Sequence, residues 1–144
     1  MRGLTFIPES HRSRVLLAPQ TTAVGAGGYF SPTPGVQKIT IRAIVSMGNA
    51  AELALTLNSA DDAVGTNPIA FTDVPIFVGG IRQIPDRHIY TVNDDTGNFI
   101  VDFCITPGLI PQGKTIGLAF ANSNAANLIS AEIIEETVYS PTVS

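Results

Sequence analysis

The chain holds few residues that could carry out acid–base or nucleophilic chemistry. Its two histidines, His11 and His88, are far apart in the sequence, and no pattern such as G-x-S-x-G or H-E-x-x-H places a nucleophile or a metal beside a base. Catalysis requires a nucleophile, a base and an orienting group that converge on one point. We therefore predict no catalytic residue and a protein that is not an enzyme.

Two aspartate-rich stretches are the candidates for a metal site. They are "NSADD" at 58–62 and "NDDTGN" at 93–98. Neither has the alternating oxygen ligands and the closing glutamate of an EF-hand calcium loop, whereas Asn, Asp and Gly in this mixture are typical of β-turns. The glycines of "GAGGYF" at 25–30 do not match the dinucleotide-binding pattern G-x-G-x-x-G either. We expect no bound metal and no cofactor.

The composition limits the kind of protein. The 144 residues are 44% hydrophobic and only 14% charged, which suits either a large core or a surface that other subunits cover. Cys104 is the single cysteine, so an internal disulfide is excluded. No apolar run approaches the roughly 20 residues that cross a membrane, and the first residues lack the apolar core of a secretory signal. These features predict a protein made in the cytoplasm that does not bind a membrane.

The charges are unevenly distributed along the chain. Residues 1–42 hold five basic residues and one acidic residue, whereas residues 43–144 hold three basic and eleven acidic residues. A basic N-terminal part on an acidic body favours contact with an acidic neighbour, although isolated solvated charges would give the same distribution. Nucleic acid is not an expected partner, because no basic patch is interleaved with aromatic residues.

Alternation of apolar and polar residues predicts a chain built of β-strands. The long candidates are 36–47, 52–57, 98–105, 114–121 and 128–139, and the short ones are 69–71, 74–78 and 88–92. Gly, Pro, Asn and Asp separate these segments, and no helical period lasts beyond two turns. The pattern indicates an all-β fold, an antiparallel β-sandwich that covers residues 36–144.

Residues 1–35 are predicted to form an extended N-terminal arm with one short strand at 13–18. Three prolines and four glycines fall between residues 19 and 35, and both residue types oppose regular ladders. Apolar groups spaced along this basic arm suggest anchors for another subunit or a partner. The predicted partner-binding residues are Arg2, Phe6, Arg12, Arg14, Leu16, Tyr29 and Phe30.

A short sequence echo connects two of the predicted strand pairs. The tripeptide Asn-Ala-Ala occurs at 49–51 and again at 124–126, each time after one apolar strand and before a strand led by leucine. Asn tolerates the positive φ of tight turns. Two matching hairpins, such as the paired Greek keys of a jelly roll, would explain the echo, and chance similarity is the alternative.

Three segments resemble proteins of tailed-phage heads: "SMGNAAELALTLNSADDAVGTN" at 46–67, "DDTGNFIVDFCITPGLIPQGKTIGLAFANSNAANL" at 94–128 and "EETVYSPT" at 135–142. More specifically, the chain is similar over roughly residues 36–142 to the jelly-roll cement, or decoration, proteins that clamp the outside of icosahedral heads, such as that of a Bordetella podophage. The resemblance lies in the residue composition and the order of these segments, and residues 1–35 match least.

The resemblance implies a structural virion protein on the outer surface of a bacteriophage capsid, made in the host cytoplasm. Such a protein binds the major capsid protein across capsomer boundaries and stabilises the contacts between capsid subunits. The resemblance also implies a homo-oligomer, with a dimer preferred to a trimer. The alternative function is a β-sandwich binding module that recognises a glycan or forms a phage fibre or adhesin domain. Aromatic-lined grooves would favour that module, whereas a flat apolar face and an ordered arm would favour a cement protein.

Overall fold

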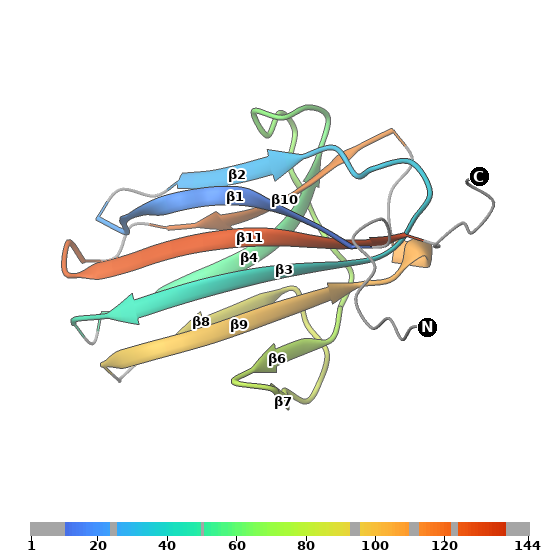
Figure 1. The fold of residues 1–144 in the computed structure, drawn as a ribbon. Coiled ribbons are helices and arrows are strands. Elements are labelled where there is room, and N and C mark those ends of the chain that lie inside the picture. Colours follow the sequence, from blue (N-terminus) through green and yellow to red (C-terminus); the bar gives the residue numbers. More distant parts are fainter. Residues whose placement is uncertain are drawn as a thin grey trace, which may run out of the picture.

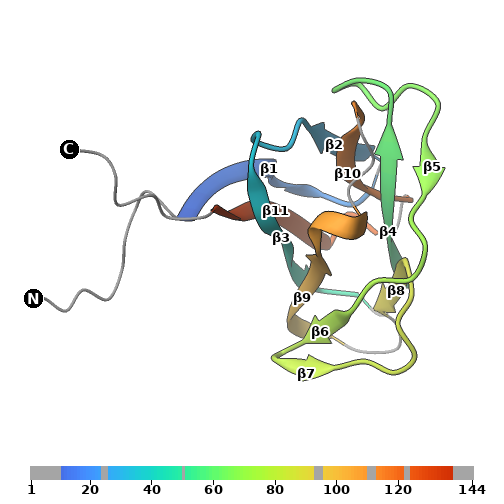
Figure 2. The ribbon, with the colours of Figure 1, turned by 90° about the vertical axis from the view of Figure 1, so that its right-hand side faces the viewer.

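The computed structural model describes residues 11–23, 26–49, 51–92, 96–109, 113–121 and 124–137. These residues form two antiparallel β-sheets that face each other across one apolar core (Figure 1, Figure 2). The described part of the chain holds no α-helix and one 3-10 turn, Pro107–Leu109. The predicted all-β, antiparallel class is therefore confirmed.

The strands are divided between a large sheet and a small sheet. In chain order they are β1 (His11–Thr21), β2 (Ala26–Phe30), β3 (Val36–Met47), β4 (Leu53–Ala60), β5 (Ile69–Ala70), β6 (Ile76–Val78), β7 (Ile81–Arg82), β8 (Ile89–Val92), β9 (Gly97–Ile105), β10 (Thr115–Phe120) and β11 (Asn127–Thr137). The large sheet has the order β1-β11-β3-β9-β6-β7, and the small sheet has the order β2-β10-β4-β5, with β8 also paired to β4. Each strand range predicted from residue 36 onward overlaps one observed strand, whereas β2 and β7 lie where no strand was expected.

Alternate residues of the long strands fill the space between the sheets. In β3, Ile39, Ile41 and Val45 are completely buried, while Lys38 points to solvent, as the predicted alternation requires. The other large side chains with almost no exposure are Leu53, Leu55, Leu57, Ile76, Phe103, Ile105, Ile116, Leu118, Ile129 and Ile133. Burying an aliphatic side chain of this size stabilises a fold by about 1.5–3 kcal/mol, so these inward rows hold the two sheets together.

The structure differs from the predicted arm over residues 11–21 and 26–30, which belong to the two sheets. β1 pairs with β11 at one edge of the large sheet, and β2 pairs with β10 at the edge of the small sheet. Proline and glycine argue against strands in a sheet centre, but edge strands tolerate both. Pro19 falls within a register shift of β1, and a Cβ on Gly28 would lie 2.6 Å from the Leu16 carbonyl oxygen. Residues 1–10 of the predicted arm lie outside the described residues.

Neither half of the sequence echo is a hairpin. β3 and β11 lie in the large sheet while β4 and β10 lie in the small sheet, so each Asn-Ala-Ala turn carries the chain from one sheet to the other. The predicted hairpins are wrong because the strands pair across the two units, β3 with β11 and β4 with β10. The entering strands correspond, since Ile41 and Ile116 are both buried. The leaving strands differ in phase, since Leu53 is buried and its counterpart Leu128 is 49% exposed.

The two turns themselves match. Asn49 and Asn124 both lie between strands, as predicted. Asn49 Oδ1 accepts a hydrogen bond from the Ala51 backbone N at 2.9 Å, and Asn124 Oδ1 accepts one from the Ala126 backbone N at 2.9 Å. Such a bond from asparagine to the backbone two residues later stabilises a tight change of direction. The repeated tripeptide thus forms the same kind of turn at two places where the chain crosses from one sheet to the other.

Asn127 joins these two turns at one end of the sandwich. Its side chain is fully buried, its Oδ1 accepts a hydrogen bond from the Asn49 backbone N at 2.8 Å, and its Nδ2 donates to the Ala51 carbonyl oxygen at 3.3 Å. A Cβ on Gly48 would lie 2.5 Å from the Ala126 carbonyl oxygen, so glycine allows the two turns to approach this closely. The turns therefore form one interlocked unit.

Replacing Asn127 with alanine is expected to lower the free energy of unfolding by about 1–3 kcal/mol, because it removes one side-chain hydrogen bond to each of two backbone groups of the first turn. Asn98→Ala, at the exposed start of β9, is the matched control and is expected to change this free energy by less than about 0.5 kcal/mol. Urea denaturation followed by circular dichroism measures both variants. Equal losses in the two would contradict the role given to Asn127.

Candidate partner-binding surface

The described residues form no cluster that could hold a metal ion. Nowhere in that part of the chain do three His, Cys, Asp or Glu side chains come together for this purpose. His88 Nδ1 lies 3.8 Å from Asp73 Oδ1, whose side chain is 65% exposed, and His11 begins the edge strand β1. His88 is thus placed for a surface ion pair. Among the same residues, no helix has the length and apolar character needed to span a membrane.

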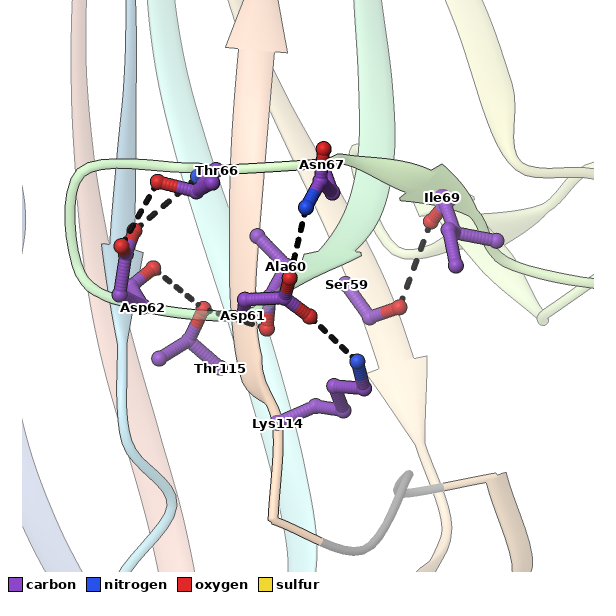
Figure 3. A network of polar contacts seen from close by, with 9 residues as sticks. All are labelled: Ser59, Ala60, Asp61, Asp62, Thr66, Asn67, Ile69, Lys114 and Thr115. Carbon is purple, nitrogen blue, oxygen red and sulfur yellow. Dashed lines mark hydrogen bonds and ion pairs between the residues drawn. The ribbon is translucent and has the colours of Figure 1, made fainter.

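The first aspartate-rich segment ends strand β4 and begins the loop that leads to β5 (Figure 3). Asp62 Oδ1 accepts hydrogen bonds from the backbone N of Val64 at 3.1 Å and of Thr66 at 3.0 Å, and Asp62 Oδ2 accepts one from Thr66 Oγ1 at 2.7 Å. These bonds lower the pKa of Asp62, and the Thr66 hydroxyl contributes most. The Asp62 carboxylate therefore stabilises the conformation of its own loop. Residues 93–95 of the second aspartate-rich segment lie outside the described residues.

Asp61 ties the same loop to the start of β10. Its carboxylate forms an ion pair with Lys114 and accepts a hydrogen bond from Asn67 Nδ2 at 2.9 Å (Figure 3). The hydrogen bond from Lys114, followed by that from Asn67, lowers the pKa of Asp61. Thr115 Oγ1 adds a hydrogen bond to the Asp62 carbonyl oxygen at 2.7 Å. Both carboxylates of the segment are thus engaged within the fold.

Arg14, a predicted partner-binding residue, pairs within its own chain. Its Nη2 donates to Glu135 Oε1 at 3.1 Å and to the Ser31 carbonyl oxygen at 3.2 Å. Glu135 is fully buried on β11 and also accepts hydrogen bonds from the Thr33 backbone N at 2.8 Å and from Thr33 Oγ1 at 2.7 Å. The Arg14 guanidinium lies 5.3 Å from the centroid of the Phe30 ring. One buried carboxylate therefore joins β1 and the β2–β3 connection to β11.

The other described candidates from the predicted arm also pack against their own chain. Phe30 is only 7% exposed and belongs to the core, and Leu16 packs against that core from β1. A Cβ on Gly65 or on Gly117 would come within 2.6 or 2.3 Å of the Tyr29 ring, so these glycines make room for the ring. Tyr29 and Phe30, which are predicted to bind a partner, thus pack against residues of their own chain.

Three predicted partner-binding residues remain. Arg12 is exposed on β1, and its Nη1 donates to Thr33 Oγ1 at 3.3 Å. Arg2 and Phe6 lie outside the described residues. The structure therefore brings Arg12, Arg14 and Phe30 together near the buried carboxylate on β11, and it leaves Arg12 as the exposed member of this group.

The outer face of the large sheet carries exposed apolar residues that are not among the predicted partner-binding residues. Ile44 of β3 and Ile100 of β9 are directly paired and are 43% and 42% exposed. Leu128 of β11 is 49% exposed near the same end of the sheet. We call these three residues the outer apolar patch. Apolar side chains that gather on a solvent face are typical of a surface that another protein covers. The sequence pattern indicates this exposure, because both isoleucines alternate with the buried residues of their strands.

A groove of about 270 Å³ adjoins this patch and shares Ile44 with it, where β1, β11 and β3 meet. It is lined by Val15, Leu17, Pro19, Ile44, Ser130, Ala131 and Glu132, so its lining is apolar apart from one hydroxyl and one carboxylate. The groove follows the part of β1 that has two register shifts, where the edge strand departs from regular pairing with β11. We call it the β1–β11 groove.

Comparisons with known proteins add no relative to this description. No protein-family model matches the chain, and no curated protein matches it. The candidate surface is therefore defined by this chain alone, as the outer apolar patch and the β1–β11 groove on one face of the large sheet.

Acid is expected to weaken the β4–β5 loop. The pKa values of Asp61 and Asp62 are lower in the folded chain than in the unfolded one, so both carboxylates stabilise the fold above the unfolded pKa of about 4. This contribution is lost as the pH falls through the lowered folded values. Asp62→Asn should therefore reduce the fall in unfolding free energy between neutral and acidic pH. Urea denaturation at a series of pH values measures this, and an unchanged pH dependence would contradict it.

Glu135→Gln is expected to lower the free energy of unfolding by about 2–3 kcal/mol, because it leaves the Arg14 cation without its buried partner while keeping the shape of the side chain. Glu136→Gln is the matched control on the opposite face of β11. The Glu136 side chain is 39% exposed and pairs with Lys38 at 3.8 Å, so its replacement should cost less than about 1 kcal/mol. Thermal unfolding compares the two variants, and similar losses would count against the buried pair.

Proposed function

We propose that the chain is a capsid cement, or decoration, protein that binds the outer surface of a phage head and stabilises contacts between major capsid proteins. The proposal starts from the resemblance of residues 36–142 to jelly-roll cement proteins. The observation that carries it is the outer apolar patch, because Ile44 and Ile100 lie side by side on an open sheet face, where a protein partner would remove them from water.

The strand order supports the jelly-roll part of this proposal. A jelly roll places eight strands in two sheets as two Greek keys. Here β1, β11, β3 and β9 lie side by side in the large sheet, and β2, β10, β4 and β8 do so in the small sheet. Chain order alternates between the sheets from β1 to β4 and again from β8 to β11. In this interpretation, β5, β6 and β7 are additions between the fourth and fifth strands.

The proposed partners are the major capsid protein and further copies of this chain, on the outside of the head. Such binding needs a rigid face rather than a reactive cleft. The central strands of the large sheet provide that face, since β3 pairs along its length with both β11 and β9. A chain with only 14% charged residues suits a protein whose surface is partly covered by neighbours.

A glycan-binding module is the alternative function. Such modules favour exposed aromatic side chains, against which a sugar ring stacks. In the described part of the chain, Tyr29 is partly buried beside two glycines, and Tyr90 is partly buried against the core. Tyr139 lies outside the described residues. Neither described tyrosine thus offers a fully open ring.

Electron microscopy of the virus particles tests the proposal. We expect density for this chain at fixed positions on the outer face of the capsid lattice. Purified chain added to undecorated heads should bind, and the double variant Ile44→Asp, Ile100→Asp should bind at least tenfold more weakly. Ile69→Asp is the matched control, because Ile69 is 59% exposed but lies on β5 of the small sheet. Density on a fibre instead of the capsid would overturn the proposal.

A chain that lacks residues 1–10 is expected to keep its fold but to bind undecorated heads more weakly, because Arg2 and Phe6 are proposed anchors while β1 stays intact. A chain that lacks residues 1–35 is expected not to fold, because it loses β1, β2 and the cation that faces Glu135. Circular dichroism measures folding, and co-sedimentation with heads measures binding. If the chain without residues 1–10 binds as tightly as the full chain, the two residues are not anchors.

A further inference from the structure

The β6–β7 hairpin and the turn after it form a projection at the edge of the large sheet opposite to β1 (Figure 1). Side-chain hydrogen bonds within this segment hold its parts together. Arg82 Nη2 donates to both carboxylate oxygens of Asp86 at 2.9 and 3.0 Å. Arg87 donates from Nη2 to the Ile84 carbonyl oxygen at 3.3 Å and from Nε to the Pro85 carbonyl oxygen at 3.2 Å. The projection, which we call the β7 knob (residues 76–87), is therefore ordered without a partner.

The β7 knob exposes two large apolar side chains. Ile81 is 70% exposed and Ile84 is 83% exposed. Because the backbone beneath them is already held, little conformational entropy remains to be lost when they bind a partner. The Arg87 guanidinium is hydrogen-bonded to carbonyl oxygens, and within the described residues no carboxylate forms an ion pair with it. The knob thus combines an apolar tip with a cation whose charge is not neutralised there.

The β1–β11 groove has the complementary character. Its apolar lining includes Val15, Leu17 and Ile44. Glu132 contributes the one carboxylate of the lining. Its cross-strand neighbour Arg42 interacts with it electrostatically but is hydrogen-bonded through Nε and Nη2 to Asp102, so two carboxylates share one guanidinium here. A groove of about 270 Å³ offers space for apolar side chains from outside. The groove therefore combines an apolar floor with a carboxylate that shares its nearest cation with Asp102.

We infer that the β7 knob of one copy of this chain docks into the β1–β11 groove of a second copy. Ile81 and Ile84 enter the apolar floor, and Arg87 faces Glu132 across the contact. A cation without a carboxylate partner on the knob faces a site on the groove where two carboxylates share one guanidinium. This charge complementarity, at two surfaces of matching apolar character, selects a second copy as the occupant. The inference deepens the homo-oligomer of the proposed function and rests on it, since it names the two surfaces involved.

The positions of knob and groove determine the kind of assembly. They lie toward opposite edges of one sheet, β7 at one edge and β1 at the other. A copy that gives its knob therefore keeps its own groove open, and the contact is head-to-tail. Repeated head-to-tail contacts produce a ring or an open array. This geometry favours such an assembly over the two-fold dimer that the resemblance implies.

The contact between two free chains is expected to be weak. Two isoleucines and one ion pair bury much less than the roughly 1,200–2,000 Å² of a stable interface. Many such contacts on a shared lattice would add to one another, because chains held side by side meet at a high effective concentration. The experiment has to detect a weak contact with a defined direction.

Cysteine cross-linking of full-length chains meets this requirement. In a Cys104→Ser background, one chain carries Ile84→Cys in the knob and the other carries Ser130→Cys in the groove. Mild oxidation of the mixture should form the mixed disulfide at least fivefold faster than a control mixture in which Ile69→Cys replaces Ile84→Cys. Adding Val15→Asp to the groove chain should remove this advantage, because it places a charge in the groove beside Glu132.

Equal rates in the two mixtures would overturn the inference. Faster linking of two Ile84→Cys chains to each other than to the groove chain would also overturn it, because a two-fold contact would then be at work. Circular dichroism confirms that each variant is folded before oxidation. Binding of each chain to undecorated heads is measured separately. If heads bind the chain but no cross-linking preference exists, the groove has another occupant, and the capsid proposal stands without this inference.

Discussion

A fully buried carboxylate must be hydrogen-bonded or paired with a cation, and on β11 this requirement is met by residues from far away in the sequence. Glu135 receives a hydrogen bond from Arg14 of β1 and two from Thr33 of the β2–β3 connection. These bonds explain why a stretch rich in proline and glycine becomes part of the sandwich. Once β1 is held beside β11, the large sheet extends far enough to form both walls of the β1–β11 groove.

Much of the fold is predictable from local patterns, because burial on one face imposes a period of two. The alternation around Ile39 and Ile41 predicts β3 to the residue, and Ile44 and Ile100 stand in the solvent phase where the structure exposes them. Glu135 also carries a signal, since it continues the inward row of Ile129 and Ile133. A charged residue at an inward-facing position of an apolar strand indicates that it has a partner in the core. The pattern alone does not say which cation is that partner.

The remaining features depend on pairing between distant segments. An Asn-Ala-Ala turn shows where the chain changes direction, but the same turn is compatible with a hairpin and with a crossing to the other sheet. The register shifts of β1 hide its alternation, and Gly28 is required by the approach of Leu16 rather than by any local pattern. The groove follows from those register shifts, so sequence periodicity could not have located it.

The place of β11 has a consequence for how the chain reaches this structure during synthesis. β11 is the last strand of the described chain, yet it lies between β1 and β3, which leave the ribosome long before it. Until β11 arrives, β1 has no partner in its sheet, and the apolar rows of β3 and β9 face an incomplete core. Pairing between such distant segments makes folding slow and produces intermediates that are prone to aggregate. A chain whose synthesis ends before β11 would have an incomplete large sheet and a strong tendency to aggregate.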